Sequence, residues 1–88
     1  MTGQSDAQLV ARVIATLAHI VRDPDVLFEP DTRLERVRGF DSHALYRLIA
    51  ELETACGVEL EPELIVPETF ATPATVAAAF ARQQRAVT

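Results

Sequence analysis

Cysteine and lysine are the residues that this 88-residue sequence most plainly lacks: it has one cysteine, Cys56, and all eight of its cationic residues are arginines. A single cysteine excludes an internal disulfide and a metal site made of several thiolates, and we expect no metal ion. The net charge of −5 argues against nucleic-acid binding, because neutralising phosphates requires an excess of positive charge. An acidic chain is better suited to docking on basic patches of other proteins.

Long hydrophobic runs are also missing. No apolar run approaches the roughly 18 residues of a membrane-spanning helix. The first residues, M-T-G-Q-S-D, lack the cationic and apolar segments of a secretion signal, so we expect a cytoplasmic protein that does not bind membranes. The length predicts one domain over residues 1–88, with a core at about residues 6–82 and frayed ends.

Helical periodicity is what the sequence has in abundance. The first predicted helix starts with the capping-box spacing of Ser5 and Gln8 and ends before Asp23-Pro24. Its apolar residues recur every three or four positions, which places them on one buried face. They are Leu9, Val13, Leu17 and Ile20.

Two further helices are predicted. The second starts at Asp41 or Ser42 and ends before Gly57, because a glycine commonly follows the last turn of a helix. The third opens at Thr72-Pro73, and its tail is expected to fray from Gln83. Since no strand-like alternation occurs, we predict an all-α fold. It is a small helical bundle of three main helices plus a short helical turn, with a long loop between the first and second helices.

The two connections between the predicted helices differ in composition. One is the long loop of residues 22–41, and the other is the link that follows the second helix. We expect the loop to be ordered, because five apolar residues can anchor it to the core: Val26, Leu27, Phe28, Leu34 and Val37. The link is acidic and proline-rich, and apolar residues such as Ile65 and Val66 are expected to hold it down. Its carboxylates form either a solvated loop or a docking surface for basic partners.

Residues 41–43 read Asp-Ser-His, the three residue types of a hydrolase triad. A triad requires the side chains to point at one another, whereas neighbours on a helix point about 100° apart. The G-x-S-x-G motif of serine hydrolases is absent as well. Two readings of Ser42 remain: Ser42 or Asp41 caps the helix, or Ser42 bears a phosphodiester favoured by the helix N-terminus.

Four segments in the same order resemble the phosphopantetheine-binding carrier proteins, which carry acyl, peptidyl or aminoacyl groups. G-F-D-S-H-A-L-Y-R-L resembles the family's D-S-L motif at the start of its second helix. P-D-T-R-L resembles the loop before it, C-G-V-E-L the stretch after it, and F-A-T-P-A-T-V the entry to the last helix. The resemblance covers about residues 6–82.

The resemblance implies specific roles. Ser42 is expected to accept 4′-phosphopantetheine from coenzyme A, transferred by a separate phosphopantetheinyl transferase. Asp41, the acid of the motif, would help to place the metal of that transferase or cap the helix. The thiol of the arm would hold an acyl or aminoacyl group as a thioester, and the protein itself would not be an enzyme. Cys56 matches a core position and would not carry the thioester.

Three residues depart from the family pattern. His43 replaces an apolar residue after the serine, Arg47 stands where fatty-acid carriers have an acid, and Ala50 where they often have methionine. The second helix therefore has only one net negative charge. Together with Glu51, these residues are expected to form the partner interface.

The departures favour a stand-alone carrier for an aminoacyl or specialised acyl group, outside housekeeping fatty-acid synthesis. The implied partners are an adenylating or acyl-loading enzyme, followed by an acyltransferase, ketosynthase or condensation enzyme, and we expect the carrier to be a monomer. The alternative is a degenerate carrier fold that serves as a protein-interaction module, with Ser42 unmodified.

Overall fold

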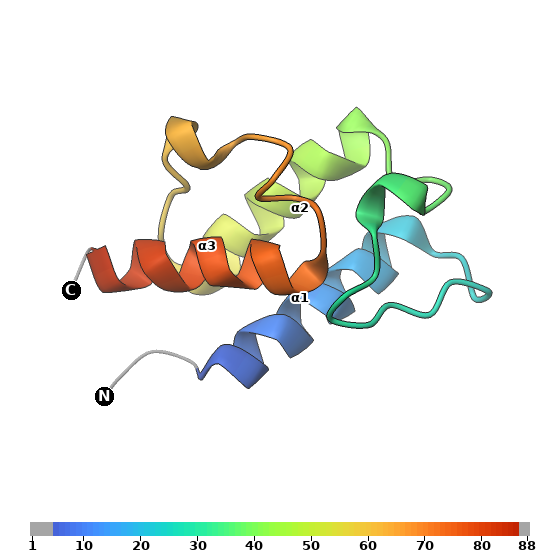
Figure 1. The fold of residues 1–88 in the computed structure, drawn as a ribbon, viewed down its shortest axis with the longest axis horizontal. Coiled ribbons are helices and arrows are strands. Elements are labelled where there is room, and N and C mark those ends of the chain that lie inside the picture. Colours follow the sequence, from blue (N-terminus) through green and yellow to red (C-terminus); the bar gives the residue numbers. More distant parts are fainter. Residues whose placement is uncertain (1–4, 87–88) are drawn as a thin grey trace.

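Three helices make up most of the computed structural model, which describes residues 5–86 (Figure 1). They are α1 (Asp6–Val21), α2 (Ser42–Cys56) and α3 (Pro73–Ala86), with two short 3₁₀ helices, η1 (Leu34–Arg36) and η2 (Pro62–Leu64). Residues 5–86 contain no strand, so the all-α prediction is confirmed. The fraying expected at residues 1–4 and 87–88 lies outside the described residues.

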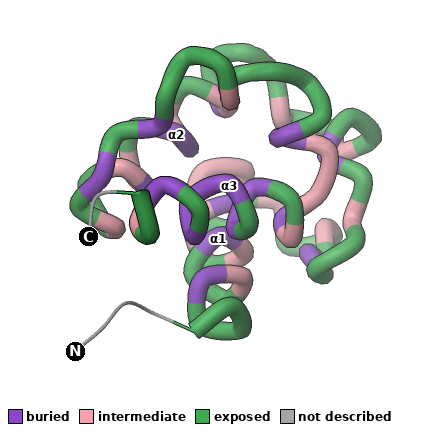
Figure 2. The backbone as a smooth tube through the Cα atoms, turned by 60° about the vertical axis from the view of Figure 1, so that its left-hand side comes forward, coloured by how far each residue is buried: buried purple, intermediate pink, exposed green. Residues whose placement is uncertain are grey.

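The core lies where α3 and α2 pack against α1, and α3 crosses α1 (Figures 1 and 2). Fully buried side chains come from all three helices and from the loop, with the spacing that puts them on one face of each helix. They are Leu9, Val13 and Leu17 of α1, Leu34 of the loop, Leu48 and Leu52 of α2, and Val76 and Phe80 of α3.

The helix ends follow local cap chemistry. Ser5 and Gln8 form both hydrogen bonds of a capping box, with the Gln8 amide donating to Ser5 Oγ at 3.2 Å and the Ser5 amide to Gln8 Oε1 at 2.9 Å. Gly57 ends α2 with φ +72°, a left-handed conformation that suits glycine. The predicted starts of all three helices are confirmed.

The loop of residues 22–41 is ordered by apolar side chains that pack on the core, among them Val26 and Val37 as predicted. Leu34 is fully buried, and its amide donates to the Ala71 carbonyl at 2.9 Å, which ties the loop to the segment before α3. Phe28 is buried as well. Leu27, however, is 79% exposed, so the prediction that it anchors the loop was wrong. The adjacent Phe28 enters the core in its place.

The link between α2 and α3 is fastened by buried apolar residues, Val58, Leu60 and Phe70, and by backbone amides that donate to side chains. The Leu60 amide donates to Glu53 Oε2 at 2.8 Å, and the Glu61 amide to Gln83 Oε1 at 3.2 Å. Ile65 and Val66, which were expected to hold the link down, are exposed. Phe70 and Leu64, which were expected to make the same contacts, do pack on the core, so the prediction failed only for Ile65 and Val66.

Helix α3 continues beyond its predicted end. Fraying was expected from Gln83, but the helix runs to Ala86 and Gln83 is buried. The reason is tertiary: the Gln83 side chain supplies the acceptor that the Glu61 amide needs.

Candidate functional site

The start of α2 is capped by Asp41 rather than by Ser42. Asp41 has extended backbone, and its Oδ1 accepts a hydrogen bond from the Ala44 amide at 2.9 Å. Ser42 is the first residue of the helix and is exposed. Among residues 5–86 its side chain has no hydrogen-bond partner. Asp41 thus satisfies the helix end and leaves the Ser42 hydroxyl available.

The residues just before Ser42 form an ordered turn. Gly39 has φ +94°, which favours glycine, and a Cβ added there would lie 3.6 Å from Val21 Cγ1. The Phe40 amide then donates to the Val37 carbonyl at 3.2 Å, and Phe40 packs against the core. The chain therefore enters α2 along a defined path, which places Ser42 at the surface.

Asp41, Ser42 and His43 do not form a catalytic relay. All three side chains are exposed, and the carboxylate of Asp41 is engaged by the Ala44 amide. Within the described part of the chain, no hydrogen bond joins any two of the three side chains. This arrangement agrees with the geometric argument against a hydrolase.

Arg47 and Glu51, two of the expected interface residues, bind each other. Arg47 Nη2 lies 3.1 Å from Glu51 Oε2, and Arg47 Nε donates to the same oxygen at 3.1 Å. His43 and Ala50 are exposed on α2 without such a partner in residues 5–86. The cation that the sequence singled out is therefore paired within its own helix, in a partly exposed contact.

Tyr46 is a surface residue that the sequence reasoning missed. Its side chain is 65% exposed, and it lies one helical turn after Ser42, where i and i+4 share a face. The sequence pattern could have indicated this exposure, because Tyr46 falls outside the apolar stripe of α2, which includes Leu48 and Leu52. Tyrosine is one of the residue types that are enriched at protein interfaces.

Cys56 lies at the other end of α2 and is partly buried. Burial raises the pKa of its thiol, and the positive charge of Arg12 opposes that shift only in part. The thiol is therefore protonated at neutral pH and is a weak nucleophile. Residues 5–86 contain no cluster of three or more potential metal ligands.

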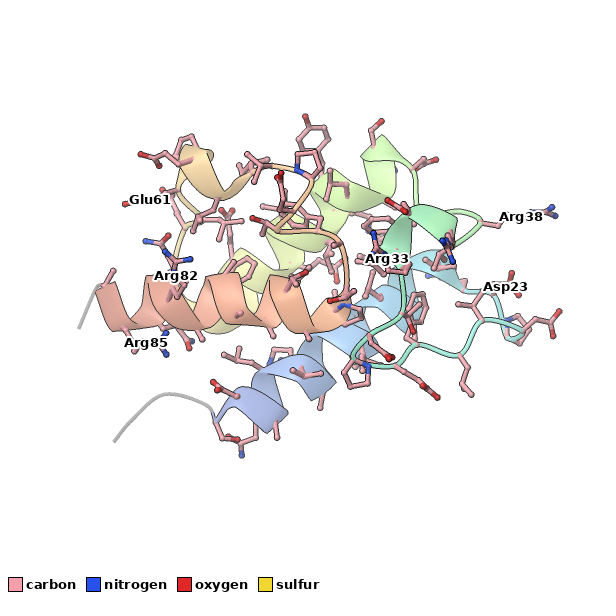
Figure 3. All side chains as sticks on the ribbon, in the orientation of Figure 1. Asp23, Arg33, Arg38, Glu61, Arg82 and Arg85 are labelled. Atoms are coloured by element: carbon pink, nitrogen blue, oxygen red, sulfur yellow. The ribbon has the colours of Figure 1, made fainter. Side chains whose placement is uncertain are left out.

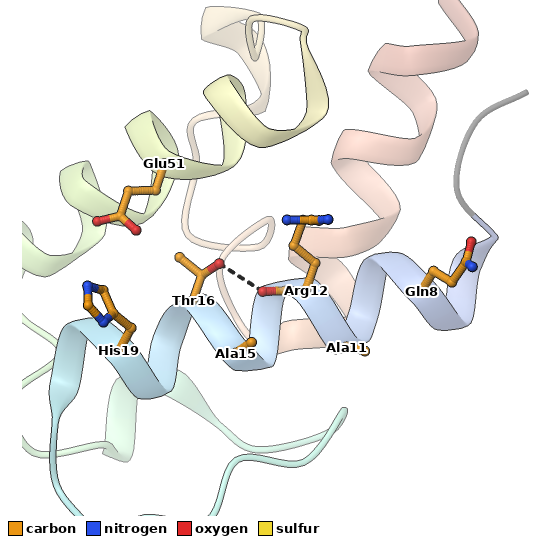
Figure 4. Close-up of a pocket in the computed structure, with 7 residues that line it drawn as sticks. All are labelled: Gln8, Ala11, Arg12, Ala15, Thr16, His19 and Glu51. Carbon is orange, nitrogen blue, oxygen red and sulfur yellow. Dashed lines mark hydrogen bonds between the residues drawn. The ribbon is translucent and has the colours of Figure 1, made fainter.

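An open groove between α1 and α2 does not include Ser42 (Figure 4). Small and polar residues line it: Gln8, Ala11, Arg12, Ala15, Thr16, His19 and Glu51. Thr16 Oγ1 donates to the Arg12 carbonyl at 2.8 Å, so this hydroxyl is bound within its own helix. His19 is exposed, as expected for a solvated residue near the end of α1.

Comparison with known proteins identifies one match. Residues 8–80 fit the family model described as phosphopantetheine attachment site, and this range contains all of α2 and most of α1 and α3. No curated protein and no solved structure matches the chain significantly. Across residues 5–86, no helix is long and apolar enough to cross a membrane.

Proposed function

Because the chain belongs to the phosphopantetheine attachment site family, whose members bear covalent 4′-phosphopantetheine, we propose that Ser42 is the residue that carries the arm. The observation that supports this assignment is the exposed Ser42 hydroxyl at the first position of α2, which the Asp41 cap leaves without a partner in residues 5–86. Attaching the arm to Ser42 would therefore break no side-chain hydrogen bond among residues 5–86.

The surroundings of Ser42 suit a phosphodiester. The N–H groups of the first turn of α2 and the positive end of its dipole favour a negative charge at this position. Asp41 keeps the end of the helix in place through the Ala44 amide. When bound, the arm supplies a terminal thiol that holds an acyl group as a thioester. The residues of this chain position the arm and present it.

The cargo is an aminoacyl or specialised acyl group, and the chain itself catalyses no reaction. Carriers of this family interact with phosphopantetheinyl transferases and acyl-handling enzymes. For this chain we expect an adenylating or acyl-loading enzyme first, and an acyltransferase, ketosynthase or condensation enzyme afterwards. The weak charge of α2, one net negative, supports a cargo other than that of fatty-acid synthesis.

The test is the intact mass of the protein after incubation with coenzyme A, Mg²⁺ and a broad-specificity phosphopantetheinyl transferase. We expect the mass to rise by one phosphopantetheine, with fragmentation locating the addition at Ser42. The competing function is an interaction module without the arm, which the unusual His43 beside Ser42 favours. No gain in mass, while a known carrier is modified in the same tube, would support that module.

His43 should act in partner choice rather than in folding. It is exposed immediately after Ser42, so His43→Leu should change the rate of acyl transfer from the cognate loading enzyme. The free energy of unfolding should shift by less than about 1 kcal/mol, as exposed substitutions usually do. Transfer kinetics of both proteins, with denaturation curves as the control, check the prediction. Identical kinetics would rule out a role for His43 at the interface.

A further inference from the structure

The first turn of α3 takes part of its cap from the loop before α2. The first four amides of a helix have no acceptor within the helix itself. In α3, Pro73 has no N–H, and the Thr75 amide donates to Thr72 Oγ1 at 3.2 Å. The Ala74 amide instead donates to the Pro30 carbonyl at 3.0 Å. The loop therefore completes the cap of a helix that is distant in the sequence.

A second hydrogen bond joins the same two segments in the opposite direction. The Leu34 amide of the loop donates to the Ala71 carbonyl at 2.9 Å, and Leu34 is fully buried. In Figure 1 the loop passes beside the start of α3. We call residues 30–34 and 71–74 together the strap. Both hydrogen bonds bridge its two sides, so separating the sides breaks both.

Hydrogen-bonded turns continue from the strap toward Ser42. The Val37 amide donates to the Leu34 carbonyl at 3.1 Å, and the Phe40 amide donates to the Val37 carbonyl at 3.2 Å. Phe40 packs against the core two residues before Ser42. The backbone that leads into Ser42 therefore begins at one of the two hydrogen bonds of the strap.

A threonine hydroxyl orders each side of the strap. On the α3 side, Thr75 Oγ1 accepts a hydrogen bond from the Thr72 amide at 3.0 Å and donates to the Thr69 carbonyl at 2.9 Å. On the loop side, Thr32 Oγ1 accepts a hydrogen bond from the Glu29 amide at 2.7 Å. Neither hydroxyl bonds to the opposite side within the described residues, so each side can be loosened separately.

We propose that the strap opens and closes as one unit and thereby couples the entry of α3 to the backbone before Ser42. Parts of a protein that share hydrogen bonds and buried side chains open cooperatively. A molecule that displaces the entry of α3 then loosens the loop that leads into Ser42, and the coupling acts equally in both directions. The coupling is independent of the arm, whereas its use in presenting the arm rests on the proposed function.

The test is native-state amide hydrogen exchange of the isotope-labelled, unmodified protein, followed for each residue by NMR. The Leu34 and Ala74 amides should have protection factors that agree within about threefold, because one opening exposes both. Thr75→Val removes the hydroxyl on the α3 side and keeps the shape of the side chain. It should lower the protection of the Leu34 and Phe40 amides about fivefold, the effect of losing one hydrogen bond.

Thr32→Val makes the reciprocal change on the loop side. It should lower the protection of the Ala74 amide, which lies on the other side of the strap, by a similar factor. Thr16→Val is the matched control, because Thr16 Oγ1 donates to the Arg12 carbonyl at 2.8 Å within α1. This control removes a hydroxyl hydrogen bond outside the strap, and should leave the protection of the Leu34 and Ala74 amides within about twofold.

The Glu61 amide is the internal reference for a change in global stability. It donates to Gln83 Oε1 at 3.2 Å, and Figure 3 shows Glu61 well apart from Arg33, the neighbour of Leu34. Neither Thr75→Val nor Thr32→Val should change its protection by more than about twofold, because local openings are separate from global unfolding.

Four results would each overturn the strap. They are unequal protection of Leu34 and Ala74 in the unchanged protein, an effect of Thr75→Val confined to α3, an effect of Thr32→Val confined to the loop, and equal shifts at Glu61. A variant that does not fold leaves the decision to the other variant and to the unchanged protein. Attachment fails separately, because it is measured by mass: coupled exchange in a protein that never gains the arm refutes attachment at Ser42 and supports the strap.

Discussion

Ser42→Ala is expected to abolish the gain of one phosphopantetheine in mass and to leave the protein folded. The hydroxyl is the proposed acceptor of the arm, and alanine has no oxygen to form the bond. Folding should be spared because the helix cap is Asp41, whose Oδ1 accepts a hydrogen bond from the Ala44 amide, and the Ser42 side chain makes no hydrogen bond within residues 5–86. Intact mass and a urea unfolding curve measure the two effects.

Asp41→Ala is the matched control for Ser42→Ala. It removes the cap and should cost about 0.5–2 kcal/mol of stability, but it keeps the hydroxyl. Modification of the folded Asp41 variant should therefore still reach one phosphopantetheine, but more slowly, because Asp41 is also the acid expected to help place the metal of the transferase. Two results would contradict the assignment: an alanine variant of Ser42 that still accepts the arm, or one that unfolds while the Asp41 variant remains stable.

Leu34→Ala is expected to destabilise the protein by about 2–5 kcal/mol, because it leaves a cavity in the core. Leu34 is fully buried and belongs to η1, which leads into the turn before α2. A small domain has about 5–15 kcal/mol of stability in total, so this is a large part of it. The loss should appear as a lower urea midpoint, with faster amide exchange over residues 34–41.

Leu27→Ala provides the comparison, because it removes the same atoms from the same loop. Leu27 is 79% exposed, so the unfolding free energy should change by no more than about 0.5 kcal/mol. Similar losses for the two leucines would mean that the loop does not depend on Leu34. The burial described for the loop would then be wrong.

The starts of all three helices and the ends of α1 and α2 could be predicted from the sequence because caps are local. A capping box joins residues three apart, as Ser5 and Gln8 do, and a left-handed C-cap depends on one residue, as at Gly57. The apolar stripes of α1 and α2 were readable for the same reason, since helix geometry alone sets their spacing. The family resemblance added Ser42 as the candidate attachment residue.

Only the tertiary structure determined which side chains are buried, because the spacing of residues along the chain does not show this. Leu27 and Leu34 are the same residue type in one loop, yet only Leu34 meets the core, because the path of the loop over α1 determines which side chain points inward. Gln83 is buried because Glu61, distant in sequence, needs an acceptor for its amide.

The ion pair of Arg47 is local by contrast. Glu51 lies four residues further along the same helix, so the spacing in the sequence already favours the pair, whereas Arg36 and Arg38 have no partner within residues 5–86. Residue types and their order therefore determined the helices, their caps and the serine at the head of α2. Which apolar side chains are buried depended on contacts between distant segments, because burial is set by distance in space.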